Sequence, residues 1–366
     1  MTTDIGIVLG TRPEIIKLSP VIQECKRLDC SYQVIHTGQH YSDRLDGTFF
    51  DQLELPAPDH NLGVGSDHQG QQTAEMLAGI EEVLLDIEPE TVLVQGDTNS
   101  VLAGAIATSK LDVELAHVEA GLRSYDRDMP EESNRVVTDH VADYLFPPTE
   151  DSEENLLEEG IPPSRILVTG NTVVDALTRH LELARKHSDV LTDCGLADEE
   201  YIVLTAHRAE NVDDERRFRQ LLSGVERAAK AFDVDVVYPI HPRAAERLEQ
   251  FEIDVPDRIC VLDPLGYLDF LRLEAAAALV VTDSGGVQEE ACILGVPCVT
   301  VRDSTERPET VSAGANWLAG CDPQTIERGV EKMLETSTDW LNPFGDGTAS
   351  HRIMQQIAPE ATEDHQ

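Results

Sequence analysis

Lysine is scarce in this sequence, and its scarcity is part of a strong imbalance of charge. The 366 residues include only six lysines, and 28 basic residues stand against 69 acidic ones, which gives a net charge of −41 at pH 7. A field of one sign repels nucleic acids and anionic membranes, so we expect neither as a partner. The acid excess also predicts a salt-rich cytosol, because at molar salt the Debye length falls to about 3 Å and self-repulsion is screened. An acidic protein from an ordinary cytosol is the alternative.

Paired cysteines and long apolar runs are missing too. The seven cysteines are odd in number and include no CxxC pair, and no signal-peptide pattern precedes the first apolar segment. The longest apolar stretch, around residues 275–281, is far shorter than the roughly 20 residues that cross a bilayer. We therefore expect a reduced, cytoplasmic enzyme whose cysteines belong to the core.

Signatures of common cofactors and metals are also absent from the sequence. The first glycine turn lacks both the lysine-bearing phosphate loop of nucleoside triphosphatases and the full glycine spacing of dinucleotide-binding folds. This disfavours ATP and NAD as cofactors. The His and Cys residues lack the close spacing on one element that zinc sites favour, so we expect no bound metal.

What the sequence does contain is a regular alternation of short apolar segments with amphipathic ones. This pattern is typical of a parallel sheet with crossover helices, and it restarts halfway along the chain. It predicts an α/β fold with two Rossmann-like, doubly wound domains, at residues 1–170 and 171–347, and a C-terminal helix within 348–366 that packs back on the first domain. The predicted strands are Ile5–Leu9, Tyr32–Thr37, Thr91–Gln95, Glu114–Val118, Tyr144–Phe146, Ile166–Val168, Tyr201–Thr205, Val234–Pro239, Ile259–Leu262, Leu279–Thr282 and Cys298–Val301.

Charged residues follow several predicted strands of the first domain. In open parallel sheets, ligands bind beyond the carboxyl ends of the strands, so residues at these positions are candidates for function. A glycine turn after the first strand leads to Arg12 and Lys17, although such turns are usually only structural. Asp97 and Glu119 follow two further strands, and Glu131 lies in the next segment; Asp97 could also simply cap a helix. Three crowded carboxylates push their pKa values apart, which lets one site hold both a general acid and a general base.

The second domain contains a candidate diphosphate site. Ser284, Gly285 and Gly286 connect a strand to a helix, so bare backbone N–H groups can approach a diphosphate while the helix dipole favours its charge. Glu290, one turn into the helix, could accept hydrogen bonds from ribose hydroxyls. A simple tight turn is the alternative. His207 also follows a strand, although a lone histidine is more often structural.

These motifs stand in the order typical of the non-hydrolysing UDP-N-acetylglucosamine 2-epimerases, and the sequence resembles that family over nearly its whole length. The resemblance implies the glycosyltransferase-B architecture, a homodimer and no cofactor. It further implies a UDP-sugar substrate whose C2 epimer feeds surface glycan synthesis, and the acid excess adds a halophilic source. The segments that carry it are GTRPEIIKLSP, TGQHY, QGDTNS, HVEAGLRS, MPEESNR, GNTVVDAL, TAHRAEN, HPR, TDSGGVQEEA and RDSTERPE.

The resemblance also implies roles for individual residues. In the expected mechanism UDP leaves C1, a carboxylate removes the C2 proton to give 2-acetamidoglucal, and UDP adds back after protonation of the opposite face. The residues implied at the reaction centre are Arg12, Lys17, Asp97, Glu119, Glu131 and His207. Those implied in binding UDP are Arg135, Ser284, Gly285, Gly286, Glu290 and Arg307.

A second, activating substrate site in bacterial members corresponds here to Gln39, His40 and His241. The sequence departs from the bacterial pattern at residues 41–43 and at Ala209, so we expect catalysis to transfer more readily than activation. Three other functions compete with this interpretation. They are a hydrolysing epimerase that releases free N-acetylmannosamine, a glycosyltransferase of the same architecture, and a non-catalytic nucleotide-sugar sensor.

Overall fold

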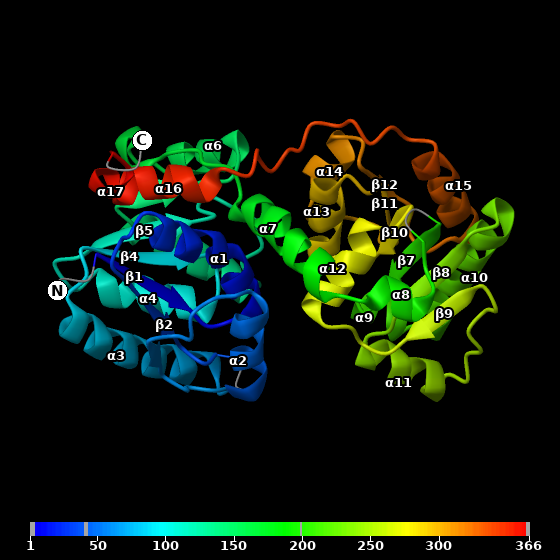
Figure 1. The fold of residues 1–366 in the computed structure, drawn as a ribbon, viewed down its shortest axis with the longest axis horizontal. Coiled ribbons are helices and arrows are strands. Elements are labelled where there is room, and N and C mark those ends of the chain that lie inside the picture. Colours follow the sequence, from blue (N-terminus) through cyan, green and yellow to red (C-terminus); the bar gives the residue numbers. More distant parts are fainter. Residues whose placement is uncertain (1–3, 40–42, 198–199, 364–366) are drawn as a thin grey trace. The chain divides into compact units, whose positions relative to one another are not determined.

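The computed structural model describes residues 4–39, 43–197 and 200–363, which form two compact units. The first unit extends to Thr178 and includes the chain again from Phe344 onward, and the second contains Arg179–Pro343. Each unit consists of a central sheet and surrounding helices (Figure 1). The first boundary falls within α7 (Thr172–His187), a continuous helix whose first turns belong to the first unit.

The sheet of the first unit, over the described residues, has six parallel strands in the order β3-β2-β1-β4-β5-β6. Because β1 lies between β2 and β4, the winding reverses there, and the carboxyl ends of β1 and β4 form a topological switch point. The strands are β1 (Ile5–Leu9), β2 (Tyr32–His36), β3 (His60–Asn61), β4 (Thr91–Gln95), β5 (Glu114–Val118) and β6 (Tyr144–Phe146). The helices are α1 (Arg12–Arg27), α2 (Asp43–Gln52), α3 (Gln69–Ile87), α4 (Asn99–Thr108), α5 (Pro130–Val141), α6 (Glu150–Glu158), the 3-10 turn Pro163–Arg165, α16 (Ala349–Ile357) and α17 (Pro359–Glu363).

The described part of the second unit repeats this winding, with six parallel strands in the order β12-β11-β10-β7-β8-β9. Its switch point lies between β7 and β10. The strands are β7 (Tyr201–Thr205), β8 (Asp235–Pro239), β9 (Ile259–Leu262), β10 (Leu279–Thr282), β11 (Cys298–Thr300) and β12 (Asn316–Leu318). The helices are α8 (Val190–Cys194), α9 (Ala209–Val212), α10 (Glu215–Phe232), α11 (Pro242–Gln250), α12 (Tyr267–Ala275), α13 (Gly285–Leu294), α14 (Pro308–Ser312) and α15 (Pro323–Leu334).

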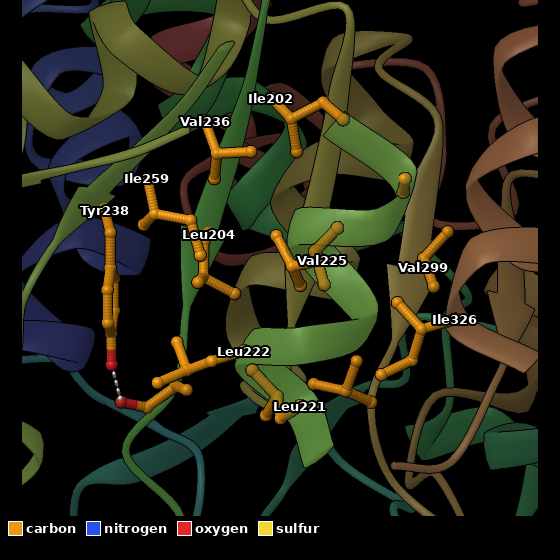
Figure 2. Packing of buried hydrophobic residues seen from close by; sticks show 14 of the residues in the cluster. Ile202, Leu204, Leu221, Leu222, Val225, Val236, Tyr238, Ile259, Val299 and Ile326 are labelled. Atoms are coloured by element: carbon orange, nitrogen blue, oxygen red, sulfur yellow. Dashed lines mark hydrogen bonds between the residues drawn. The ribbon is translucent and has the colours of Figure 1, made fainter. Parts of the chain in front are cut away.

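Apolar packing fixes the strand ends in place. The central strands β1 and β4 are buried along their whole length, as expected of parallel strands covered on both faces. In the second unit, Ile202 and Leu204 of β7 belong to the same buried cluster as Leu222 and Val225 of α10 (Figure 2). At the edge of this cluster, the Tyr238 hydroxyl donates to a main-chain carbonyl at 3.1 Å. Residues that directly follow these strands therefore start from rigid positions.

The C-terminal segment belongs to the first unit, where α16 packs against α1. The carboxylate of Asp175 accepts the N–H groups of Ala349 and Ser350 at 3.2 and 2.9 Å, which satisfies the free donors at the start of α16. At the α1 contact, the sulfur atoms of Cys25 and Met354 are 3.7 Å apart. None of the helices in the described ranges combines the length and apolar composition needed to cross a membrane.

Most predicted strands are present, but the strand predicted at Ile166–Val168 is wrong. Ile166 forms an isolated bridge to Leu145 in the first unit, and the N–H groups of Leu167 and Thr169 donate to Leu145 O and Pro147 O, but no strand forms. The segment follows directly from the Pro163–Arg165 turn, and Leu167 is 37% exposed, so its apolar residues do not form a continued ladder. The short edge strands β3 and β12 were not predicted, and β2, β8 and β11 are each one residue shorter than expected.

Candidate active site

The turn after β1 has no room for a side chain at Gly10. A Cβ atom there would lie 2.0 Å from Thr37 Oγ1 and 2.2 Å from Ser100 Oγ. The Gly10 N–H donates to Glu14 Oε2 at 2.9 Å, and the Thr98 hydroxyl donates to Glu14 Oε1 at 2.7 Å. Glu14 thereby joins the loop after β1 to the loop after β4 across the switch point.

Glu14 is a candidate that sequence reasoning missed. Its side chain is almost completely buried, and this burial raises its pKa from 4.5 to about 7 although hydrogen bonds from Thr98, Thr11 and Gly10 act in the opposite direction. An acidic residue in the first turn of a helix at the carboxyl edge of the sheet was the available signal. Glu14 therefore changes charge near neutral pH within the candidate site.

Lys17 and Glu119, which were both predicted as reaction-centre residues, form an ion pair. Glu119 has a φ of 68°, in the left-handed region that residues other than glycine rarely adopt and that is often found at functional sites. Its carboxylate accepts from Lys17 Nζ at 2.6 and 2.8 Å, from Asn171 Nδ2 at 3.2 Å and from Gln95 Nε2. These donors enclose a carboxylate that is 7% exposed and stabilise its charged form. Gln95 and Asn171 were not predicted.

Asp97 is held by two residues of α5. Its carboxylate pairs with Arg135, and its main-chain carbonyl accepts from Asn134 Nδ2 at 2.9 Å. Arg135 Nη1 also contacts Glu132 Oε2 at 3.0 Å. Arg135 was predicted to bind substrate. In the structure it is the counterion of a predicted reaction-centre residue, and its part in substrate binding stays a prediction.

A cavity of about 450 Å³ opens at this edge of the first unit. Its lining includes the carboxylates Asp97 and Glu131 together with the amide side chains of Asn99 and Asn134. A volume of this size is within the range of about 300–1,000 Å³ typical of small-ligand sites. The structure thus brings two of the three predicted carboxylates, Asp97 and Glu131, to one cavity. Glu119 lies close to Gly96, the residue before Asp97, since a Cβ atom added to Gly96 would be 3.8 Å from Glu119 Oε2.

The other predicted residues of the first unit have separate surroundings. Arg12 is exposed at the start of α1, and its guanidinium carbon lies 5.7 Å from the centroid of the Phe49 ring. Gln39 lines the same cavity, and its side-chain oxygen accepts the N–H and the hydroxyl of Ser100 at 3.0 and 2.7 Å. His40 lies outside the described residues.

In the second unit, His207 is oriented by the buried carboxylate of Asp283. Asp283 accepts the main-chain N–H groups of His207 and Arg208 and the Asn211 amide at 3.0–3.1 Å. Burial alone would raise the pKa of Asp283, but the His207 imidazole, the Arg208 N–H and the Asn211 amide outweigh it and hold the pKa below its usual value. His207 Nδ1 lies 3.2 Å from Asp283 Oδ1, so Nε2 is the nitrogen that can face a ligand. The ring of His241 lies 5.4 Å from that of His207, and burial together with this neighbour lowers the pKa of His241.

The Ser284–Gly286 turn begins α13, as predicted, and Ser284 caps the helix by accepting from the Val287 N–H at 3.5 Å. A Cβ on Gly285 or Gly286 would meet its nearest atom at 3.7 or 3.9 Å, which is ordinary van der Waals contact. The fold therefore has room for a methyl group at both glycines, so the need for bare backbone that we predict here is attributed to a ligand.

Two further predicted residues lie on or near α13. Glu290 is partly buried, and burial together with the Glu290 carboxylate raises the pKa of the fully buried Glu274 well above its usual range. Arg307 Nε lies 3.4 Å from Glu289 Oε2. Contact of Glu290 and Arg307 with a nucleotide stays a prediction.

Two Rossmann-like units with the same strand order define a glycosyltransferase-B architecture, which confirms the predicted fold class. The family model for UDP-N-acetylglucosamine 2-epimerases matches residues 23–358. The chain belongs to this family.

Individual relatives match nearly the whole chain. A UDP-N-acetylglucosamine 2-epimerase from Methanocaldococcus jannaschii is 50% identical, over 96% of this chain and 98% of its own. A crystal structure of the enzyme from that organism in complex with UDP-GlcNAc and UDP has a TM-score of 0.83 at 49% identity, covering 98% and 100% of the two chains. A UDP-2,3-diacetamido-2,3-dideoxy-D-glucuronate 2-epimerase from Pseudomonas aeruginosa is 41% identical, over 96% of this chain and 98% of its own.

Proposed function

We propose that this chain catalyses the reversible C2 epimerisation of UDP-N-acetylglucosamine to UDP-N-acetylmannosamine without a cofactor. The proposal depends on the observation that Asp97 and Glu131 line the same cavity, in a chain that belongs to this family. Two relatives with about 50% sequence identity to this chain are named UDP-N-acetylglucosamine 2-epimerase.

The chemistry requires a leaving group. The C2 proton of the sugar has no neighbouring carbonyl to acidify it, so direct removal is slow. If the bond from C1 to the UDP oxygen breaks first, positive charge develops on the ring and the C2 proton becomes removable by a carboxylate. The products of this step are 2-acetamidoglucal and UDP. Proton delivery to the opposite face of C2 and return of the UDP oxygen to C1 complete the inversion.

We assign the proton transfers at C2 to Asp97 and Glu131, because both line the cavity. Glu119 is enclosed by donors, including Lys17, which suits it to stabilise positive charge on the ring more than to exchange protons with it. The exposed Arg12 supplies positive charge for the departing diphosphate, and Lys17 would add to it on leaving its ion pair with Glu119.

We assign the nucleotide to the second unit. The N–H groups of residues 284–286 would receive the diphosphate, Glu290 the ribose hydroxyls, and Arg307, with Arg135 of the first unit, further oxygens of UDP. His207 Nε2 would protonate or neutralise the leaving phosphate oxygen, with Asp283 holding the ring by Nδ1. In this assignment the N-terminal domain carries the carboxylates and the C-terminal domain carries the UDP site.

We further propose a cytoplasmic homodimer that works in a salt-rich cell. The net charge of −41 supports the salt dependence, because counterions must screen its self-repulsion. Activity should rise as potassium chloride increases toward molar concentrations, and light scattering should give twice the 40.3 kDa mass of the chain. Gln39, His40 and His241 are our candidates for an activating substrate site, which sigmoidal kinetics would reveal.

The proposal is tested by proton NMR of the purified chain with UDP-N-acetylglucosamine in heavy water and high salt. Deuterium should enter C2 as the manno isomer appears, with the sugar still bound to UDP. Release of free N-acetylmannosamine would instead indicate a hydrolysing enzyme. An unchanged C2 signal would refute epimerisation of this substrate, and the diacetamido-glucuronate analogue serves as the alternative substrate in the same assay.

Two variants test the residue assignment. Asp97→Asn and Glu131→Gln should each lower turnover 100-fold or more, about 2.7 kcal/mol of transition-state stabilisation. The exposed Glu82 of α3 offers a control, since Glu82→Gln should leave turnover unchanged. Near-normal rates in both site variants would overturn the assignment.

A further inference from the structure

A buried network of charged side chains lies behind the carboxyl edge of the first sheet. His117 of β5 contacts Asp139 of α5, with Nδ1 and Oδ1 2.7 Å apart, and both side chains are fully buried. Arg123 Nη1 lies 2.7 Å from Asp139 Oδ2, and two other nitrogens of Arg123 donate to the carboxylate of Glu159 at 2.7 and 2.6 Å. The Arg123 side chain is 1% exposed. Sequence reasoning gave none of these residues a role.

The hydrogen-bond partners of His117 favour a proton on each of its ring nitrogens. Nε2 lies 2.8 Å from the carbonyl oxygen of Gly96, which can only accept a hydrogen bond. Nδ1 faces Asp139, whose other oxygen also takes the Gly121 N–H at 3.2 Å and the Arg123 guanidinium. The guanidinium of Arg123, which is always charged, lies against Asp139 and stabilises its ionised form, so we infer a carboxylate there. Both ring nitrogens therefore face acceptors.

Charge balance leads to the same conclusion. If His117 carries both protons, it and Arg123 supply two positive charges against the carboxylates of Asp139 and Glu159, and the network is neutral. If His117 lost a proton, a lone pair would face either the Gly96 carbonyl or the Asp139 carboxylate at hydrogen-bond distance. The fully buried Asp139 would then share the single positive charge of Arg123 with Glu159, and an incompletely compensated buried charge is costly.

The network holds the two loops that carry Asp97 and Glu119. Gly96, the acceptor of His117 Nε2, immediately precedes Asp97, and its own N–H donates to Val118 O at 3.1 Å. Gly121, the donor to Asp139, closes the turn in which Glu119 takes its left-handed conformation. A charge-assisted bond to the Gly96 carbonyl is roughly twice as strong as a neutral one, so the imidazolium form holds this peptide more firmly.

We propose that His117 is a buried imidazolium at neutral pH and acts as a positioning residue, which fixes the Asp97 loop against the Glu119 turn for catalysis. The positioning part rests on the proposed epimerase function. The doubly protonated ring does not depend on it.

The protonation state is tested on the wild-type chain, labelled with ¹⁵N in the imidazole rings of its 12 histidines. At pH 7.5 a histidine with an ordinary pKa of about 6.5 is mostly neutral. The resonances of His117, assigned by correlation to its backbone, should show a proton on each ring nitrogen. A ring nitrogen without a proton at this pH would overturn the proposal.

The positioning role is tested by His117→Gln, which keeps a neutral donor but cannot supply N–H groups from two ring positions. The folded variant should lose about tenfold or more in kcat with KM changed less than twofold, because binding groups stay in place while the carboxylate loops loosen. The exposed His187 at the end of α7 is the control, and His187→Gln should leave both constants unchanged. An unchanged kcat in folded His117→Gln would overturn the positioning role.

The two kinds of failure can be told apart. If the wild-type chain does not turn over UDP-N-acetylglucosamine, the proposed function fails, together with the positioning role that rests on it. The NMR spectrum still decides whether the imidazolium exists. If His117→Gln does not fold, Asp139→Asn replaces it, and should lower kcat at constant KM while one ring nitrogen of His117 loses its proton.

Discussion

Replacing Glu14 with glutamine should make the first unit less sensitive to pH. The carboxyl of Glu14 titrates at about 7 in the folded chain and near 4.5 when unfolded. Between these values the folded state binds more protons than the unfolded state, so the free energy of unfolding falls as pH rises. Above pH 7 the full cost of an ionised, buried Glu14 is present. Glutamine does not ionise, so Glu14→Gln avoids this cost.

The size of the effect follows from the two pKa values. Their difference, 7 − 4.5 = 2.5 units, corresponds to about 3 kcal/mol at 1.36 kcal/mol per unit. The stability of Glu14→Gln relative to the wild type should therefore rise by about this amount between pH 4 and pH 8. At pH 4, where Glu14 is protonated in both states, the difference reflects only the changed hydrogen bonds to Gly10 and Thr98.

The assay must report on the first unit alone. Both tryptophans, Trp317 and Trp340, lie in the second unit, so tryptophan fluorescence does not follow unfolding of the first. Native-state hydrogen exchange, read by mass spectrometry on peptides that cover β1 and β4, gives the required opening free energies. The exposed Glu82→Gln variant should show a constant difference from the wild type at all pH values. A similarly constant difference for Glu14→Gln would refute the reasoning.

Three further substitutions should separate stability from function. Gly286→Ala should change the melting temperature by less than about 2 °C yet weaken UDP binding about tenfold, or about 1.4 kcal/mol, by calorimetry, because the free protein has room for the methyl group. Gly121→Ala should lower the free energy of unfolding by more than about 2 kcal/mol in hydrogen exchange, because its Cβ would lie 2.1 Å from Ser152 O at a φ of +80°. Asp283→Asn should lower kcat about tenfold, or about 1.4 kcal/mol, and ¹⁵N spectra should show His207 losing its Nδ1-protonated form.

Much of the fold was predictable from the sequence, because the pattern of apolar and polar residues along the chain reflects which residues are buried. Strands such as β1 and β4 are rich in apolar residues, are buried along their whole length and have the predicted bounds. The two-residue β3 has too few positions to show a period. The three-residue β12 is as short as β6, which was predicted, but its one buried residue is the polar Asn316. The false strand at Ile166–Val168 has the opposite cause, since its apolar residues resemble a strand but form only an isolated bridge.

Site residues that directly follow a strand could be predicted from the sequence. Residues whose role depends on contacts with distant segments could not. Asp97 and Glu131 were both predicted, and the structure places them on one cavity. Glu14, His117 and Asp139 were missed because their surroundings are formed by segments distant in sequence. A glutamate in the first turn of a helix looks like an ordinary dipole partner until Thr98, 84 positions away, is seen beside it.

The return of the chain to the first unit at Phe344 has a consequence for biosynthesis. All residues of the second unit are translated before α16 exists, so the later of the two cores in sequence can be completed first. During synthesis, the surface of α1 around Cys25 in the first unit stays uncovered until Met354 has been translated. Loss of the last twenty or so residues by a nonsense mutation or proteolysis would therefore damage the part of the molecule that is made earliest.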